Sequence, residues 1–263
     1  MSIIFSRRRQ WIKLILCFTA FLAGVAGSLQ APFYPKEAGK KGVSQMQVGM
    51  VFASYHFTIF ATSPFFGRNC QNIGIKRMIY IGILVMGLCA IAFSLLGFIG
   101  NKSIFVSLSY AIRLVEALGH SSFKTATFAM VAKGYPDAIT FIYASLQASF
   151  GAGLTLGPFA GELLYSIGGF FLPFALTGSL TLLAAIMTYF IIPSNDNLSS
   201  VQTIEDVPQK GISDVLRIPD ILIQVLSTLG ATICIGFLQA TLRNHIDQFQ
   251  LSDTLIGTLT HEH

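Results

Sequence analysis

Long apolar runs recur along almost the whole chain, and they constrain its fold more than any other feature. A bilayer core about 30 Å thick needs roughly 20 mostly apolar residues in a helix. Runs of this kind, each bounded by charged or turn residues, cover residues 11–35, 46–66, 78–99, 103–123, 139–165, 170–192 and 221–242. Their length indicates helices, because a strand that spans a membrane needs only about 10 alternating residues. The sequence therefore predicts an all-α polytopic membrane protein with seven spans.

The composition excludes a soluble domain. Of the 263 residues, 53% are hydrophobic and only 11% are charged, and the mean hydropathy is +0.66. An ordinary soluble domain has about 25% charged residues, so this chain cannot cover a soluble surface with charge. The net charge of +5 does not indicate nucleic-acid binding, because the charges lie in short gaps between apolar runs rather than in one patch. We therefore expect the chain to lie in a lipid bilayer and not to bind nucleic acid.

Motifs of enzymes and metal proteins are absent from the sequence. The 4 cysteines have no paired spacing, and the 5 histidines have no metal-ligand spacing with carboxylates inside the spans. No Gly-x-Ser-x-Gly motif of a serine hydrolase occurs. We therefore expect no metal, no cofactor and no catalytic residues.

The distribution of Lys and Arg residues indicates a cytoplasmic N-terminus, because short cytoplasmic loops carry an excess of basic residues. With that orientation, the cytoplasmic segments contain Arg7, Arg8, Arg9, Lys13, Arg68, Lys76, Arg77, Lys124, Lys133, Lys210 and Arg217. The opposite side contains Lys36, Lys40, Lys41, Lys102 and Arg243. The first run is too long for the apolar part of a typical signal peptide, so we expect it to be a retained helix. On the non-cytoplasmic side, Asn101 begins an Asn-Lys-Ser triplet and is a candidate for glycosylation.

A long polar stretch divides the chain. Residues 1–10 are predicted to be a cytoplasmic N-terminus, 11–192 a six-helix half, and 193–219 a central cytoplasmic linker. Residues 220–263 are predicted to contain a seventh helix and the truncated start of a second half. Six spans, a linker and a new span are the layout expected when a second six-span unit follows.

Arg113 and Glu116 lie inside the fourth span. A charge there costs at least ~2.5 kcal/mol, so such residues are candidates for function. Being three residues apart, they share one face of a helix and can neutralise each other. One interpretation is a structural ion pair. The other is that Glu116 titrates, and that its protonation is coupled to movement of a substrate.

Two glycine-rich segments accompany this pair. Gly153, Gly157 and Gly161 recur every four residues in the fifth span, next to Pro158, and predict a face that another helix can approach closely. Between the second and third spans, Gly67 and Gly74 predict a tight cytoplasmic turn. The basic residues after it, Lys76 and Arg77, are expected to bind helix ends and carboxylates, or only to mark the cytoplasmic side.

Together, these three segments resemble the major facilitator superfamily of secondary transporters. The turn that begins at Gly67 resembles its glycine-rich basic signature, residues 113–119 resemble its fourth-helix signature, and residues 153–161 resemble the antiporter signature of its fifth helix. The resemblance covers the first six spans and the beginning of the second half. It implies a substrate site between two rocking halves, with the glycine face of the fifth span packed mainly against helices of the second half.

Residues 31–42 are similar to the vesicular amine and polyamine branch of that superfamily. This resemblance implies antiport of protons against a small organic cation, at an intracellular vesicle membrane. The chain departs from the family pattern at Gln71 and Asn72, which replace an acidic and a basic residue of the loop signature, and at Glu162, which replaces a glycine. It also has Ala23 where the monoamine carriers have an acidic residue in the first helix.

Three other expectations follow. Because the substrate site lies between two halves, this chain alone is expected to be an incomplete carrier that needs its missing C-terminal half. The alternative is a non-transporting form that associates with a full-length carrier. A seven-helix receptor would require an external N-terminus, which the basic residues contradict. Lys124, Tyr143 and Gln147 are candidates for the substrate path, and Lys124 is expected to extend towards the cytoplasm.

Overall fold

A computed structural model of the chain describes residues 2–192, together with residues 219, 222, 223, 225–227, 229, 230, 233 and 234. Residues 2–192 form six long α-helices: α1 (Ser2–Lys40), α2 (Gln45–Ile73), α3 (Ile75–Ser94), α4 (Lys102–Gly134), α5 (Ile139–Gly168) and α6 (Phe171–Ile191). Short 3-10 helices, η1 (Leu95–Phe98) and η2 (Pro136–Ala138), follow α3 and precede α5. The described part of the chain contains no strand. The predicted linker, except for residue 219, and most of the seventh predicted span lie outside the described residues.

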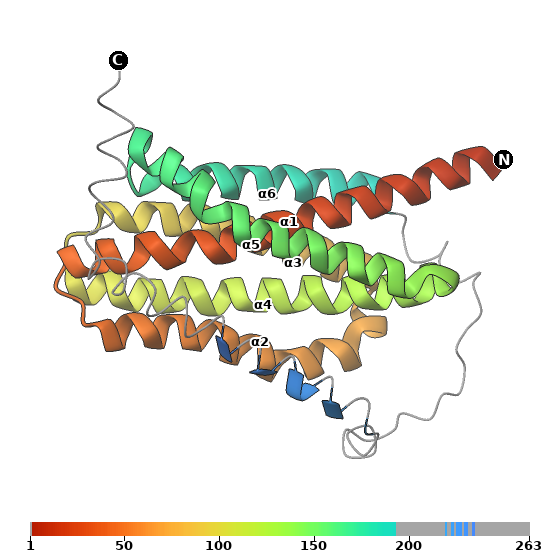
Figure 1. Ribbon diagram of the computed structural model, residues 1–263, viewed down its shortest axis with the longest axis horizontal. Helices are drawn as coiled ribbons and strands as arrows, with labels where there is room; N and C mark the ends of the chain where they lie inside the picture. The colour runs from red at the N-terminus through yellow and green to blue at the C-terminus, as the bar shows by residue number, and fades with distance from the viewer. Residues whose placement is uncertain are drawn as a thin grey trace. The chain divides into compact units, whose positions relative to one another are not determined.

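The six helices run side by side as a bundle (Figure 1). The principal contacts join α1 to α5 and α6, α4 to α2 and α3, and α3 to α6. If α1 is exchanged with α4, α2 with α5 and α3 with α6, the same set of helix contacts results. Such a symmetry is that of two inverted three-helix repeats, which place α1 and α4 in equivalent positions.

Local sequence signals set the helix ends. Ser44 begins α2 with a capping box, in which its side chain accepts a hydrogen bond from the Gln47 backbone and the Gln47 side chain accepts one from the Ser44 backbone. Asn101 caps α4, because its Oδ1 accepts hydrogen bonds from the amides of Ser103 and Ile104 at 2.9 and 3.3 Å. Gly74 separates α2 from α3 at a φ of 95°, a conformation that favours glycine.

Three helices are much longer than the sequence predicts. The first span was predicted over residues 11–35, but α1 runs from Ser2 to Lys40. The second span was predicted to end at residue 66, but α2 continues to Ile73, so the predicted loop is reduced to the turn at Gly74. The fourth span was predicted to end at residue 123, but α4 continues to Gly134 and stops just before Pro136. Apolar run length marks the bilayer core only, whereas a helix continues into the polar region until a residue breaks it. Lys124 therefore belongs to a helix and not to a loop.

Four stretches of helix are long and apolar enough to cross a membrane, and they are Gln10–Lys40, Ile75–Phe98, Pro136–Gly168 and Phe171–Ile191. The helices α2 and α4 fall outside this set although they have 29 and 33 residues. Polar residues lower their hydropathy, and in α4 many of these residues are buried inside the bundle. That α2 and α4 also span the membrane remains a prediction from their length.

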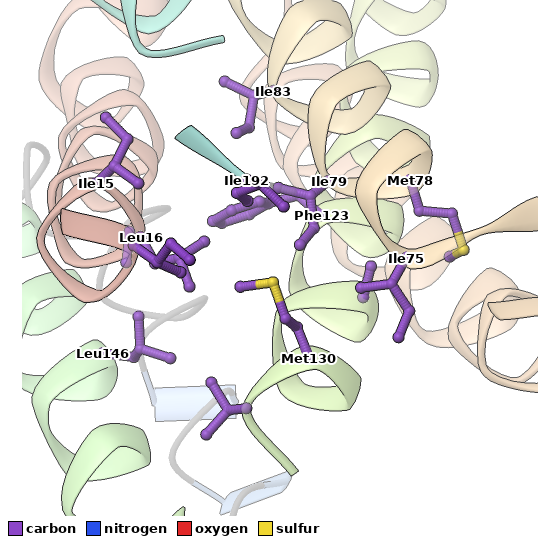
Figure 2. Packing of buried hydrophobic residues seen from close by; sticks show 14 of the residues in the cluster. Ile15, Leu16, Ile75, Met78, Ile79, Ile83, Phe123, Met130, Leu146 and Ile192 are labelled. Atoms are coloured by element: carbon purple, nitrogen blue, oxygen red, sulfur yellow. The ribbon is translucent and has the colours of Figure 1, made fainter. Parts of the chain in front are cut away.

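The core consists of two apolar clusters, one towards each end of the bundle. In the first cluster, Leu16 of α1, Ile79 of α3, Phe123 and Met130 of α4 and Leu146 of α5 are buried together (Figure 2). The second cluster is rich in aromatic residues and contains Phe33, Tyr34, Phe52, Phe93, Phe105 and Phe174. Along α1, α3 and α4, residues of one cluster are followed by residues of the other. In α4, most of the buried residues between the two clusters are polar.

The glycine face of α5 packs against α1, and the expectation that it packs mainly against the second half is wrong. A Cβ on Gly153 would meet the Phe21 carbonyl oxygen, and a Cβ on Gly157 would meet the Ser28 hydroxyl. Ser28 also donates a hydrogen bond to the Gly153 carbonyl at 3.4 Å. Without side chains on α5, the two backbones come into direct contact. The glycines therefore build the interior of this six-helix bundle.

Candidate functional site

A polar stripe runs along α4, beginning between the two apolar clusters and continuing beside the first of them. Its residues, Arg113, Glu116, His120, Lys124 and Thr127, are separated by three or four positions and therefore lie on one face of the helix. All but Lys124 are buried, and Lys124 is partly buried. The stripe faces α1, α2 and α5, which contribute the remaining polar groups of the candidate site.

The ion pair predicted from the sequence is present at the start of this stripe. Arg113 Nη1 donates a hydrogen bond to Glu116 Oε2 at 2.9 Å, and the two residues are only 1% and 2% exposed. Gln30 of α1 donates a longer hydrogen bond to the same carboxylate oxygen at 3.5 Å. Two neutralised charges with hydrogen-bond partners can be buried, whereas one of them alone would carry a large desolvation cost. The pair also connects the equivalent helices α1 and α4.

Aromatic residues of α2 extend the site from the ion pair to His120. The Arg113 guanidinium lies over the ring of Tyr55, 4.0 Å from its centroid, and at 5.8 Å from the ring of Phe52. The Tyr55 hydroxyl and His120 Nδ1 are joined by a hydrogen bond of 3.1 Å. A continuous series of polar contacts therefore leads from Gln30 through Glu116, Arg113 and Tyr55 to His120.

A cavity lies where this series ends, between α1, α4 and α5. Residues that line it include Ala20, Ala23, His120, Lys124, Thr127 and Gln147. Its volume is about 30 Å³, which is enough for two or three waters or for one small functional group. Lys124 and Gln147, two of the predicted path residues, thus lie at the cavity.

Tyr143, the third residue predicted for the substrate path, contacts α4 and does not line the cavity. Its hydroxyl donates a hydrogen bond to the Phe128 carbonyl of α4 at 2.7 Å, and it is not among the residues that line the cavity. The hydrogen bond joins α5 to α4.

The remaining sequence-predicted residues lie away from this cavity. Gly67 and Arg77 are exposed, and Gly74 forms the turn between α2 and α3. Lys76 lies over the ring of Tyr189 in α6, 4.8 Å from its centroid, and is in none of the ion pairs found in the described part of the chain.

The antiporter-like segment of α5 faces α1. Gly161 approaches Leu29 and Phe33, so it extends the packing of Gly153 and Gly157. Pro158 lies inside α5 without ending the helix. Asn101, the candidate for glycosylation, is exposed at the start of α4.

Gln30, Tyr55 and His120 were missed by the sequence interpretation. His120 had a detectable signal, because it follows Glu116 by four positions on the same helix face. Gln30 and Tyr55 come from other helices, and their positions depend on helix rotation, which a single sequence does not give. Within the described residues, no group of three His, Cys, Asp or Glu side chains is placed to hold a metal ion.

Several curated relatives of the chain are transporters by name. It is 31% identical over 231 residues to the mouse (Mus musculus) MFS-type transporter SLC18B1, a match that covers 88% of this chain and 49% of the relative. It is 28% identical to the human (Homo sapiens) synaptic vesicular amine transporter and 26% identical to the vesicular acetylcholine transporter of Torpedo marmorata. These two matches cover 75% and 76% of this chain, and 36% and 37% of the respective relatives. The chain spans about half the length of the curated relatives it matches, or less.

The family assignment rests on a family-model match that covers most of the chain. The model of the Major Facilitator Superfamily matches residues 16–260, which is more than half of the chain. The helical bundle and its apolar helices agree with an integral multi-pass membrane protein. The chain therefore belongs to the Major Facilitator Superfamily of transporters, and within it is related to the vesicular amine transporters.

Proposed function

We propose that this protein takes part in the exchange of protons for a small organic cation, and that Glu116 is the group that binds the exchanged proton. The observation that carries the proposal is the buried pair of Arg113 and Glu116, linked to α1 by Gln30. A buried carboxylate inside a transporter is a recurrent element of proton relays. The contacts through Tyr55 to His120 connect this carboxylate with the cavity.

Protonation of Glu116 would change the forces between helices. The ionised carboxylate accepts hydrogen bonds from Arg113 on its own helix and from Gln30 on α1. A neutral carboxyl group attracts the guanidinium far less, so the positive charge of Arg113 would need another partner. A proton would thus favour a second arrangement of α1 and α4, as a coupled transporter requires.

The class of substrate is inferred from the relatives. The names of two of them refer to amines and to acetylcholine. Amines at neutral pH and acetylcholine both carry a cationic nitrogen. We propose the same class here, with a polyamine as the first candidate. We also propose a vesicle membrane and a cytoplasmic N-terminus, so that the proton leaves an acidic lumen as the cation enters it.

The test uses the native protein, expressed from its own transcript and reconstituted in liposomes with an acidic interior. Wild-type protein is expected to accumulate labelled spermidine or serotonin. Glu116→Gln keeps the size of the side chain but cannot ionise, so it is expected to lose accumulation driven by the proton gradient. Exchange of labelled for unlabelled substrate needs no net proton movement and is expected to survive in this variant.

The matched control is Glu162→Gln, because Glu162 is exposed on α5. It is expected to transport like wild type. Gradient-driven accumulation that is unchanged in Glu116→Gln would contradict the role of Glu116. Absence of both accumulation and exchange in the wild-type native protein would contradict transport itself.

A further inference from the structure

The cavity between α1, α4 and α5 has a cation in its wall but no acid. Lys124 of α4 is partly buried there, and none of the residues that line the cavity is Asp or Glu. Among the described residues, Lys124 is in none of the three ion pairs. It is also in none of the contacts between a cation and an aromatic ring that are found in this part of the chain. The charge of Lys124 is therefore not balanced by a described neighbour.

The rest of the wall is suited to an ammonium group. Phe123 and Phe128 of α4 and Phe150 of α5 line the cavity, and the face of an aromatic ring attracts a cation. Gln147 of α5 lines it as well and is exposed, so the cavity can be reached from the surface of the bundle. Its amide oxygen can accept a hydrogen bond from an ammonium group. An ammonium group is also the part of the molecule shared by the proposed amine substrates.

The titratable groups near the cavity add positive charge and no negative charge. His120 is the other titratable residue in the wall, and α1 and α5 contribute none to it. Lys124 and Arg113 of α4 and His56 of α2 act on His120 through space. Glu116, the acid of the stripe, is already paired with Arg113. A substrate ammonium group in the cavity is therefore surrounded by groups that are cationic or can become so.

Two ammonium groups cannot lie in this cavity together. Its volume of about 30 Å³ fits one small functional group, so a substrate ammonium would lie against the Lys124 side chain. Two positive charges in contact repel each other strongly where water is partly excluded. A nearby cation favours the neutral form of an amine, and lysine, unlike arginine, can give up its proton inside a protein. The repulsion is removed if Lys124 loses its proton as the substrate binds.

We propose that Lys124 carries a second exchangeable proton, which leaves when a substrate ammonium group enters the cavity. The Lys124 Nζ then becomes a neutral amine, and its lone pair accepts a hydrogen bond from the substrate ammonium. The displaced proton passes to water on the cytoplasmic side, so the cavity keeps a single positive charge. A lumenal proton returns to Lys124 when the substrate is released there. The inference rests on the proposed function and adds a proton to the one bound by Glu116.

The test counts the protons that are released when putrescine binds to the native protein in nanodiscs. Titration calorimetry in two buffers with different ionisation enthalpies gives this number, and the measurement is repeated over a pH series. At its maximum over the series, wild type is expected to release about one proton more than Lys124→Gln. Lys133→Gln is the matched control, because it removes a charge of α4 outside the cavity, and it is expected to release as many protons as wild type.

Lys124→Arg gives a second and independent comparison. Arginine keeps its charge at every pH, so this variant cannot release the proton and keeps the repulsion. It is expected to release about one proton fewer than wild type and to bind putrescine at least tenfold more weakly. A loss of packing alone would not change the number of released protons. If Lys124→Gln does not fold, this variant decides the outcome.

Two results would overturn the inference. One is that wild type and both Lys124 variants release the same number of protons at every pH, and the other is that wild type does not bind putrescine. Glu116→Gln separates this inference from the proposed function, because it is expected to release about one proton fewer than wild type, and Glu116→Gln with Lys124→Gln about two fewer. Loss of the Lys124 effect alone overturns the inference and leaves the role of Glu116, and loss of the Glu116 effect alone does the reverse.

Discussion

The contact between α1 and α5 leads to a quantitative prediction for Gly153→Ala. An added Cβ would meet the Phe21 carbonyl oxygen, the Val25 nitrogen at 2.9 Å and the Gly24 Cα at 3.1 Å. All three are backbone atoms, so no side chain can rotate away to make room. Since non-bonded carbon atoms prefer separations of roughly 3.5–4.0 Å, and the Phe21 carbonyl oxygen would be the nearest of the three atoms, the two helices would have to move apart by more than about 1 Å.

The expected cost is that of overpacking, about 1–3 kcal/mol of unfolding free energy. Alanine also favours a helix over glycine by about 1 kcal/mol, which offsets part of the loss. Gly151→Ala gives the matched control, because Gly151 lies on the same helix and an added Cβ would meet nothing within 4 Å. The helix-propensity gain is common to both variants, so the difference between them isolates the overpacking cost.

The assay is reversible unfolding of the purified protein by SDS in mixed micelles, followed by circular dichroism. Gly151→Ala is expected to be as stable as wild type or up to about 1 kcal/mol more stable. Gly153→Ala is expected to unfold at lower SDS, with a free energy about 1–3 kcal/mol below that of Gly151→Ala. Equal stability of the two variants would refute the direct backbone contact between α1 and α5.

Two further predictions concern the ion pair and the orientation. Arg113→Met leaves the Glu116 carboxylate buried without its cation and is expected to lose about 3–5 kcal/mol of unfolding free energy, whereas Arg113→Met combined with Glu116→Leu is expected to recover most of it. In the same SDS assay, a double variant as unstable as the single one would argue against pairing. The orientation test uses a variant in which the 4 native cysteines are replaced by alanine, and sealed vesicles with their cytoplasmic side outwards. Positions 68 and 102 are both exposed. A membrane-impermeant maleimide added outside is expected to label Arg68→Cys and not Lys102→Cys. The reverse pattern would place the N-terminus on the other side.

The sequence predicts the helices of the bundle well at their centres and less well at their ends. Apolar runs are visible because the bilayer requires them, so each of the six predicted spans up to residue 192 coincides largely with an observed helix. The ends of α2 and α4 depend on local breaks at Gly74 and Pro136, which lie well beyond the apolar runs. The added turns carry polar residues and are therefore not distinguished from loops by hydropathy.

For the candidate site, contacts within one helix were predictable from the sequence, and contacts between helices were not. Pairing of Arg113 with Glu116 was predictable, because residues three apart on a helix are neighbours whatever surrounds them. Contacts of this pair with Gln30 and Tyr55 depend on which faces of α1 and α2 turn inwards. For the glycine face of α5, the sequence predicted close packing but gave no means to identify α1 as the partner.

The pairing of α1 with α5 also has a consequence for biosynthesis. Ser28 and Gly153, which are in contact in the folded bundle, are 125 residues apart in the chain. At a synthesis rate of about 5–20 residues per second, α5 emerges roughly 6–25 seconds after α1. During this time, α1 has been made but its glycine-lined neighbour has not, and the Ser28 hydroxyl has only the Val25 carbonyl of its own helix as a partner. The first helix is therefore inserted without the packing partner that it has in the folded bundle.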